Sequence, residues 1–257
     1  MESRSDITKR KVLVTGAAGR IGSYFAQHSC SKYELRLLVH DGDDAGKIES
    51  HGEVVHADLL DLEGMKAACA GIDTVVHLAA NPEPSAAWEE LLETNITGTY
   101  HAFVAAKHAG CRRVIFASSI HAISGYPEDV QVKTSDPVNP GDLYGVSKCF
   151  GEALGRYMAE KEGLSVVALR IGTFKSREEA AREGAIRYLD AFVSRRDLNQ
   201  LIWRCIDAEG LRFAIFHGIS NNRFKRLDIS DARETVGFQP MDDFAELNPA
   251  AVTSRKG

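Results

Sequence analysis

Residues Lys11-Val-Leu-Val-Thr15, followed directly by Gly16-Ala-Ala-Gly19-Arg-Ile-Gly22, decide the fold of this chain. The first stretch predicts a short buried strand, and the second predicts a glycine turn that opens into a helix. Such a turn lets backbone N–H groups approach a pyrophosphate, and the helix N-terminus adds partial positive charge. The spacing is GxxGxxG, which departs from the GxGxxG of many dinucleotide sites. In this context it predicts a dinucleotide site that includes Gly16, Gly19, Arg20, Ile21 and Gly22.

Apolar runs of strand length recur along the rest of the chain, with helical patterns between most of them. They lie at Lys11–Thr15, Glu34–Val39, Glu53–Ala57, Thr74–Ala80, Arg113–Ser118, Ser165–Ile171 and Arg212–Gly218. Their Val, Ile and Leu content is typical of strands covered by helices on both faces. We therefore predict an α/β protein with a doubly wound, mostly parallel sheet of the Rossmann type. We expect residues 1–171 to form the dinucleotide-binding domain and residues 172–257 a small substrate-binding region packed on it.

The composition argues against several classes of protein. The 257 residues carry a net charge of -5, and no basic run stands out, so a nucleic-acid surface is not expected. No apolar stretch has the length of a signal peptide or a membrane span. The five cysteines, odd in number and without ligand spacing, predict reduced core residues and no metal site. We expect a cytoplasmic protein without a membrane partner.

A candidate base lies near the middle of the chain, in Tyr144-Gly-Val-Ser-Lys148. Four positions on a helix place the phenol and the ammonium on one face, one turn apart. A positive charge beside a tyrosine favours the phenolate and is expected to lower its pKa from about 10. The pair therefore predicts proton abstraction by Tyr144.

Further polar or flexible residues follow other predicted strands, where ligands bind in open parallel sheets. They are Asp58, Ala79-Ala80-Asn81, Ser118-Ser119 and Arg170-Ile-Gly-Thr173. The chain also contains the motifs TGAAGRIG, Asp58-Leu59, HLAA at 77–80, Asn95 in NITGT, YGVSK and RIG at 170–172. Together, these residues and motifs resemble the extended short-chain dehydrogenase/reductases, of the NAD-dependent epimerase/dehydratase type. The resemblance covers nearly the whole chain.

Within that family the chain is most similar to the uronate dehydrogenases, through FASSIHAISGYP at 116–127 and LYGVSKCFGE at 143–152. This resemblance implies an NAD-dependent sugar oxidoreductase that oxidises a hexuronic acid at C1 to an aldarolactone. It also implies that Arg187 holds the substrate carboxylate. Two positions depart from the family pattern, because Ile120 and Pro82 stand where those enzymes usually carry polar residues.

The resemblance further implies catalytic roles for Tyr144, Lys148, Ser119 and Asn95. Tyr144 is the base, Lys148 adjusts its pKa and bonds the nicotinamide ribose, and Ser119 holds the reacting oxygen. Ser118 competes with Ser119 for this role, and Asn95 is expected behind Lys148. The expected substrate-binding residues are Ser119, Ile120, His121, Tyr144, Thr173 and Arg187.

The expected cofactor is NAD, with NADP as the alternative. Asp41, after the second strand, would bond the adenosine ribose diol, although His40 could take its place. Asp58 and Leu59 would bracket the adenine. The remaining expected cofactor contacts are Leu78, Ala79, Ala80, Asn95, Tyr144, Lys148, Ile171 and Phe174.

Two other enzymes and one non-enzyme stay open at this point: a neutral aldose dehydrogenase, a sugar epimerase, and a dinucleotide sensor. Retention of Tyr144 and Lys148 argues against the sensor, since such proteins often lose this pair. The resemblance also implies a homo-oligomer, formed through the predicted helices Trp88–His108 and Asp142–Lys161.

Overall fold

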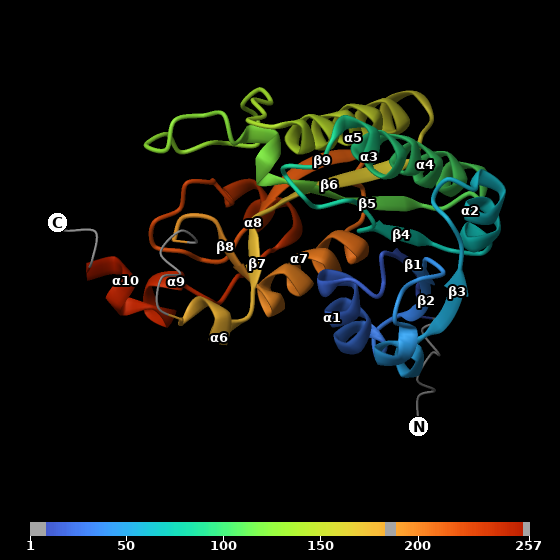
Figure 1. The fold of residues 1–257 in the computed structure, drawn as a ribbon, viewed down its shortest axis with the longest axis horizontal. Coiled ribbons are helices and arrows are strands. Elements are labelled where there is room, and N and C mark those ends of the chain that lie inside the picture. The colour runs from blue at the N-terminus through green and yellow to red at the C-terminus, as the bar shows by residue number, and fades with distance from the viewer. Residues whose placement is uncertain (1–8, 183–188, 254–257) are drawn as a thin grey trace.

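The computed structural model describes residues 9–182 and 189–253, and its central element is a seven-stranded parallel sheet with helices on both faces (Figure 1). The strand order is β3-β2-β1-β4-β5-β6-β9. These strands span Glu53–His56, Glu34–Val39, Lys11–Thr15, Thr74–His77, Arg113–Ser119, Ser165–Ile171 and Phe213–Gly218. The prediction of a doubly wound parallel sheet is confirmed.

Two layers of helices enclose the sheet (Figure 1). Helices α1 (Arg20–Ser29) and α7 (Arg195–Asp207) cover one face. Helices α2 (Leu62–Cys69), α4 (Gly98–His108) and α5 (Leu143–Lys161) cover the other. The strands divide their side chains between two buried clusters, so both faces are apolar and alternate hydrophobic–polar patterning is absent.

The order of the strands reverses next to β1, which pairs in parallel with β2 on one side and with β4 on the other. A crevice forms at the carboxyl ends of the strands at such a reversal, and ligands of this fold class bind there. The glycine turn follows β1 and therefore lies at this crevice. Within the described residues, short 3-10 turns form at η1 (Ala45–Lys47), η2 (Glu49–His51) and η4 (Ile120–Ile123).

The predicted helix Trp88–His108 is present but contains a π turn. It consists of α3 (Trp88–Leu91), the π segment η3 (Leu92–Thr97) and α4. A π turn adds a residue to the helix and commonly occurs at functional sites. Here it carries the buried Asn95.

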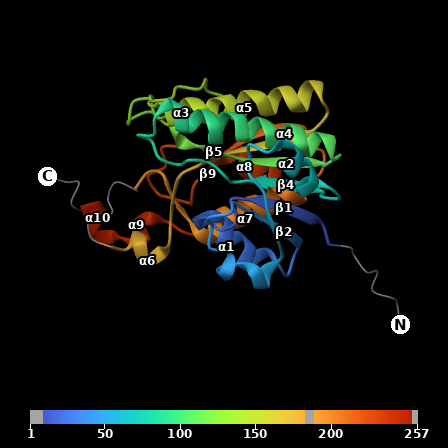
Figure 2. The same cartoon turned by 45° about the vertical axis from the view of Figure 1, so that its right-hand side comes forward.

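The C-terminal part combines two kinds of structure. Helix α7 and strand β9 complete the main sheet and its helix layer, so the predicted division at residue 171 is coarser than the architecture. The remaining elements form the smaller region, with α6, α9 and α10 together at one end of the molecule (Figure 2). They are β7 (Thr173–Lys175), α6 (Arg177–Ala180), β8 (Phe192–Ser194), α8 (Ser230–Val236), α9 (Phe244–Leu247) and α10 (Pro249–Thr253). Among the described helices, none has the length and apolar character required to cross a membrane.

Candidate active site

The glycine turn after β1 has a backbone that only glycine allows. Gly16 has φ 64°, and a Cβ there would lie 2.9 Å from the Ala79 backbone. A Cβ on Gly22 would lie 2.3 Å from the Gly16 carbonyl oxygen. Gly19 is the N-cap of α1, so the N-terminus of this helix opens at the turn. The absence of side chains leaves a cradle of backbone N–H groups for an anionic pyrophosphate.

Two grooves meet at this turn and share Gly16, Gly19, Leu78 and Ala80. The first, which we call the catalytic groove, has a volume of about 440 Å³. It is lined by Gly16, Gly19, Arg20, Ile21, Gly22, Leu78, Ala80, Pro82, Ala117, Ser118, Ser119, Tyr144, Lys148, Ile171, Gly172 and Phe174. The second, the adenosine groove, has a volume of about 490 Å³. A continuous pair of grooves on both sides of a glycine cradle fits an extended dinucleotide.

The adenosine groove contains most of the residues expected for it, with one correction. Asp58, Leu59 and Ala79 line it, but Asp41 does not. The Asp41 side chain is 91% exposed and lies 3.3 Å from His56 Nδ1. After β2, the acidic residue that lines the groove is Asp43, together with His40.

Local hydrogen bonds explain the position of Asp43. The His40 N–H donates to Asp43 Oδ2 at 2.9 Å, and the Asp43 N–H donates to the His40 carbonyl at 2.9 Å. This tight turn folds the chain back after β2 and brings Asp43, two residues later than expected, to the groove. The sequence signal was the acidic run Asp41-Gly-Asp-Asp44, which contains several candidates.

Helix α5 carries the tyrosine and the lysine on its buried face. Asp142 caps the helix, with Oδ1 accepting from the Gly145 N–H at 2.6 Å. Tyr144 is 9% exposed and Lys148 is 3% exposed, and both line the catalytic groove. Gly151 permits the close approach of α5 to the sheet, because a Cβ there would lie 2.2 Å from the Phe116 ring.

The pKa of Tyr144 differs from the expectation. Burial raises it above the ordinary value, and a hydrogen bond from Ser119 acts in the opposite direction. Lys148 Nζ lies 5.4 Å from the centroid of the Tyr144 ring, over its face rather than beside the hydroxyl, so its charge does not produce the expected lowering. Burial lowers the pKa of Lys148 to about 8.

The two serines at the end of β5 point to different partners. Ser119 lies against Tyr144, and its Oγ also accepts from the His121 N–H at 3.2 Å. Ser118 Oγ donates to Glu152 Oε1 at 2.6 Å, within a buried ion pair. Geometry therefore favours Ser119 as the serine that works with Tyr144.

Asn95 fixes the loop that follows β4. Its Oδ1 accepts from the Asn81 N–H at 2.8 Å, and its Nδ2 donates to the Asn81 carbonyl at 3.0 Å and to Ser147 Oγ at 3.0 Å. Asn95 thus holds both backbone groups of Asn81 and also contacts helix α5 through Ser147. The π turn supplies the side-chain direction that this requires.

His121 stands beside the tyrosine. Its Nδ1 lies 2.6 Å from Asp142 Oδ2, and its ring meets that of Tyr144 edge-on with 5.3 Å between centroids. Asp142 was not anticipated from the sequence as its partner. The contact orients the imidazole at the border of the catalytic groove.

The other predicted substrate residues have mixed outcomes. Ile120 packs in a cluster with Ile123 and is not among the residues that line the catalytic groove. Thr173 begins β7, and its N–H donates to the Ala191 carbonyl at 2.8 Å. Arg187 lies outside the described residues. Pro82 and Gly172 line the groove without having been predicted.

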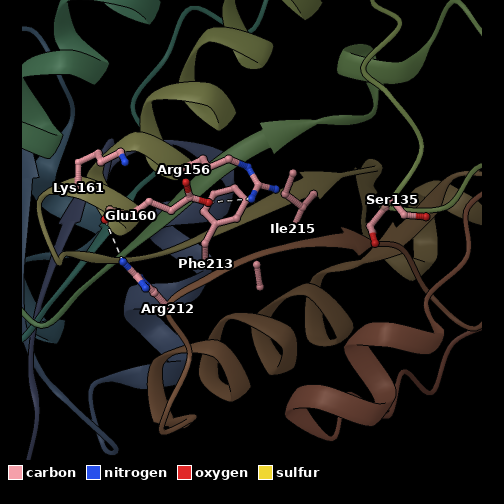
Figure 3. Close-up of a pocket in the computed structure, with 9 residues that line it drawn as sticks. Ser135, Arg156, Glu160, Lys161, Arg212, Phe213 and Ile215 are labelled. Carbon is pink, nitrogen blue, oxygen red and sulfur yellow. Dashed lines mark hydrogen bonds and ion pairs between the residues drawn. The ribbon is translucent and has the colours of Figure 1, made fainter.

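A larger cavity of about 650 Å³ lies at the edge of the sheet beside β9 (Figure 3). Three of its charged residues have partners: Arg156 bonds Glu160 at 3.1 Å and stacks on Phe213, and Arg212 bonds the carbonyls of Ala159 and Glu160 near the end of α5. None of the catalytic candidates lines it. Volume alone therefore does not identify the site, and the chemistry lies at the glycine turn.

Known proteins resemble the chain over most of its length. The model of the NAD dependent epimerase/dehydratase family matches residues 12–212. NAD-dependent glucose-6-phosphate dehydrogenase of Haloferax volcanii is 35% identical, covering 92% of this chain and 95% of that protein. L-arabinose 1-dehydrogenase (NAD(P)(+)) of the same organism is 35% identical, covering 92% and 98%. The crystal structure of uronate dehydrogenase from Agrobacterium tumefaciens has a TM-score of 0.83 at 32% identity, covering 95% and 89%.

These similarities confirm the predicted fold, the enzyme class and the cofactor NAD. The three relatives described above are dehydrogenases of sugars or sugar acids, and the substrates in their names differ from one another. The chain belongs to the NAD-dependent epimerase/dehydratase family, in the extended branch of the short-chain dehydrogenase/reductases.

Proposed function

We propose that this family member oxidises C1 of a hexuronic acid to an aldarolactone. The observation that carries the proposal is the buried Tyr144–Lys148 pair in the catalytic groove, with Ser119 bonded to the phenol. The 32% identity to a uronate dehydrogenase over 95% of the chain supports the choice of substrate class.

In the proposed reaction, NAD accepts the hydride that leaves C1. Tyr144, as phenolate, takes the proton of the C1 hydroxyl, so that the carbonyl of the lactone forms. Ser119 holds the same oxygen in line by a hydrogen bond. Lys148, which lies over the face of the Tyr144 ring, bonds the ribose of the nicotinamide in this proposal.

The charge of the catalytic groove supports an anionic ligand. Arg20 and Lys148 line it, and its described lining contains no carboxylate. Outside the lining, Glu179 lies 3.6 Å from Arg20 Nη2. Arg20 Nη2 donates to the Phe174 carbonyl at 3.0 Å, which directs the guanidinium toward the border between the turn and the smaller region. We propose Arg187 as the carboxylate partner on the basis of the family resemblance alone.

A second candidate is the oxidation of a neutral or phosphorylated aldose. It is favoured by the two relatives at 35% identity, whose names specify glucose-6-phosphate and L-arabinose. Pro82 in the groove also removes a hydrogen-bonding position that a uronate site would use.

An absorbance assay of NADH formation separates these functions. The purified protein is tested with NAD or NADP against glucuronate, galacturonate, glucose-6-phosphate, glucose and L-arabinose. We expect kcat/KM to be highest for a sugar acid, and Arg187→Ala to remove that preference. A higher value for a neutral or phosphorylated aldose would establish the second candidate, and turnover without net NADH would indicate an epimerase.

We also propose that the protein is a homodimer that pairs the outer faces of α3–α4 and α5. Large apolar residues are exposed on these neighbouring helices: Trp88 at 41%, Leu92 at 40%, Tyr100 at 48%, Val146 at 40% and Tyr157 at 53%. Covering them with a second copy would remove this surface from water. Sedimentation velocity tests it, with a dimer expected for the native chain and a monomer for Tyr100→Glu. A native monomer at micromolar concentration would reject the proposal.

A further inference from the structure

A buried carboxylate joins helix α5 and strand β5, which carry Tyr144, Lys148 and Ser119, to the neighbouring strand β6. Glu152 of α5 is 4% exposed and Arg170 of β6 is 1% exposed. Arg170 donates from Nε to Glu152 Oε1 and from Nη2 to Oε2, both at 2.9 Å, as a two-pronged ion pair. Ser118 of β5 donates to the same Oε1 at 2.6 Å. We call Ser118, Glu152 and Arg170 the carboxylate clamp.

On α5 and β5, the clamp lies directly beside the catalytic residues. Glu152 follows Lys148 by one helical turn and Tyr144 by two, on the same face of α5. Ser118 precedes Ser119 on β5, and the register pairs Ser118 with Arg170 across the two strands. The clamp therefore fixes the position of α5 over β5 at the point where Ser119 meets Tyr144.

Stability alone does not account for this arrangement. The cost of removing two charges from water offsets most of the attraction of a buried ion pair, and apolar replacements are often at least as stable. The neighbour His217, opposite Arg170 on β9, adds no charge, because burial lowers its pKa to about 4. The pair does provide direction, since a forked guanidinium and a carboxylate bind in one geometry.

We propose that Glu152 is a positioning residue, which holds α5 against β5 and β6 so that Ser119 bonds the Tyr144 hydroxyl. Ser118 is accordingly the third member of the clamp and not a second catalytic serine. The proposal goes beyond the substrate assignment, because it concerns the base and applies to any sugar that Tyr144 deprotonates.

The measurable consequence is a change in the titration of Tyr144. Its bond to Ser119 lowers the pKa of the phenol, against the larger effect of burial. Loosening the clamp weakens that bond and raises the pKa. Among the described residues, the polar groups that face the phenol are those of Ser119, His121, Asp142 and Lys148, and no clamp member is among them. Ser118→Ala changes no charge, so a shift in that variant acts through position, whereas Glu152→Gln also leaves the charge of Arg170 unpaired, which acts to lower the pKa of the phenol.

The test compares Ser118→Ala and Glu152→Gln with matched changes at the other end of the same strands. There, Ser165 Oγ accepts from Arg113 Nε at 2.8 Å and donates to the Leu211 carbonyl at 2.7 Å, in a network around an arginine that is also 1% exposed. Ser165→Ala and Arg113→Lys thus disturb a comparable buried network away from the catalytic groove.

The readout is the phenolate absorbance of each variant with NAD, titrated against pH, minus that of the same variant carrying Tyr144→Phe. We expect the midpoint to rise by about 1 pH unit in Ser118→Ala, by less in Glu152→Gln, and to stay unchanged in the two controls. Below the midpoint, this predicts a loss of about tenfold in kcat that high pH restores, with KM for NAD unchanged.

Superimposable titrations of the native protein and Ser118→Ala would overturn the proposal, as would an equal shift in the controls. If Glu152→Gln does not fold, Ser118→Ala decides, because it removes one hydroxyl only. The titration needs no sugar, so its result is independent of whether a uronic acid proves to be the substrate.

Discussion

The two ends of the central sheet each bury a cation, and they surround it differently. At the amino end, Arg113 donates four hydrogen bonds, to Ser165 Oγ and to three main-chain carbonyls at and after the end of α7. At the carboxyl end, the described partners of Lys148 Nζ are the rings of Phe116 and Tyr144, with centroids at 5.3 and 5.4 Å. Burial lowers the pKa of both, that of Arg113 to about 10 and that of Lys148 to about 8.

These two environments imply different roles: the amino end of the sheet contributes to stability, and the carboxyl end contributes to reactivity. A cation with most of its donors bonded holds strands and helices together. A buried cation without a carboxylate partner lowers stability, but its charge stays available to a bound ligand. We therefore expect substitutions at the carboxyl end to change activity, and substitutions at the amino end to change stability.

The largest effect is expected for Tyr144→Phe, which removes the proposed base and keeps the ring. We expect kcat to fall by about 10³-fold or more, with an unchanged melting temperature. NADH formation and thermal unfolding measure the two quantities. Tyr157→Phe, at a tyrosine that is 53% exposed, is the control and should retain activity. A loss of less than tenfold in Tyr144→Phe would exclude the phenol as the base.

Arg113→Met should give the largest loss of stability. It removes four hydrogen bonds, worth roughly 1 kcal/mol each, so the free energy of unfolding should fall by about 4 kcal/mol. Urea unfolding measures this change, while kcat of the folded fraction should stay native. A urea midpoint equal to that of the native protein would show that the hydrogen bonds of Arg113 do not contribute to stability as we expect.

Lys148→Met, in contrast, should raise the free energy of unfolding. The folded-state pKa of about 8 lies below the ordinary 10.5, so between these values the unfolded chain binds more protons at Lys148, and stability rises with pH. The shift corresponds to about 3 kcal/mol, which the methionine variant should gain at pH 7. Urea midpoints from pH 7 to 10.5 should rise for the native chain relative to the variant. A variant less stable than the native chain would contradict this view of Lys148.

A smaller effect is expected at the adenosine groove. Asp43→Asn should lower the preference for NAD over NADP by about tenfold, because a charged acceptor for the ribose diol is lost. Asp41→Asn is the matched control, since its side chain is 91% exposed and outside the groove. The ratio of kcat/KM with NAD to kcat/KM with NADP measures this preference. Equal effects of the two changes would assign the ribose to neither aspartate.

The smallest effect concerns the cap of α5. Asp142→Ala should lower the free energy of unfolding by about 1 kcal/mol, whereas Asp142→Ser keeps a side chain that caps the helix. Both variants remove the partner of His121, so the difference between them isolates the cap. Equal losses would show that the contact with His121, and not the cap, accounts for the effect.

Much of the fold could be predicted from the sequence, because continuous Val, Ile and Leu runs specify buried parallel strands. The expected Glu53–Ala57 and the observed β3 (Glu53–His56) differ by one residue. The shared face of Tyr144 and Lys148 follows from helical periodicity in the same way. The π turn at Asn95 could not be predicted, since no residue type specifies the insertion of one residue in a helix.

The site predictions that differ from the structure depend on the direction in which a side chain points. Asp41 and Asp43 are chemically identical, and a single turn bonded through His40 decides which of them reaches the groove. The pKa of Tyr144 depends on whether Lys148 approaches the hydroxyl or the ring face, and helical spacing leaves this open. The direction of Ile120 likewise depends on a cluster assembled from distant segments.

Transfer of deuterium tests most directly the claim that this groove removes a hydride from a sugar carbon. The native protein is incubated with NAD and glucuronate deuterated at C1, and both products are analysed by NMR. We predict deuterium at C4 of the reduced nicotinamide, a lactone without deuterium, and neither product with Tyr144→Phe. Deuterium that remains on, or returns to, the sugar would contradict net oxidation at C1.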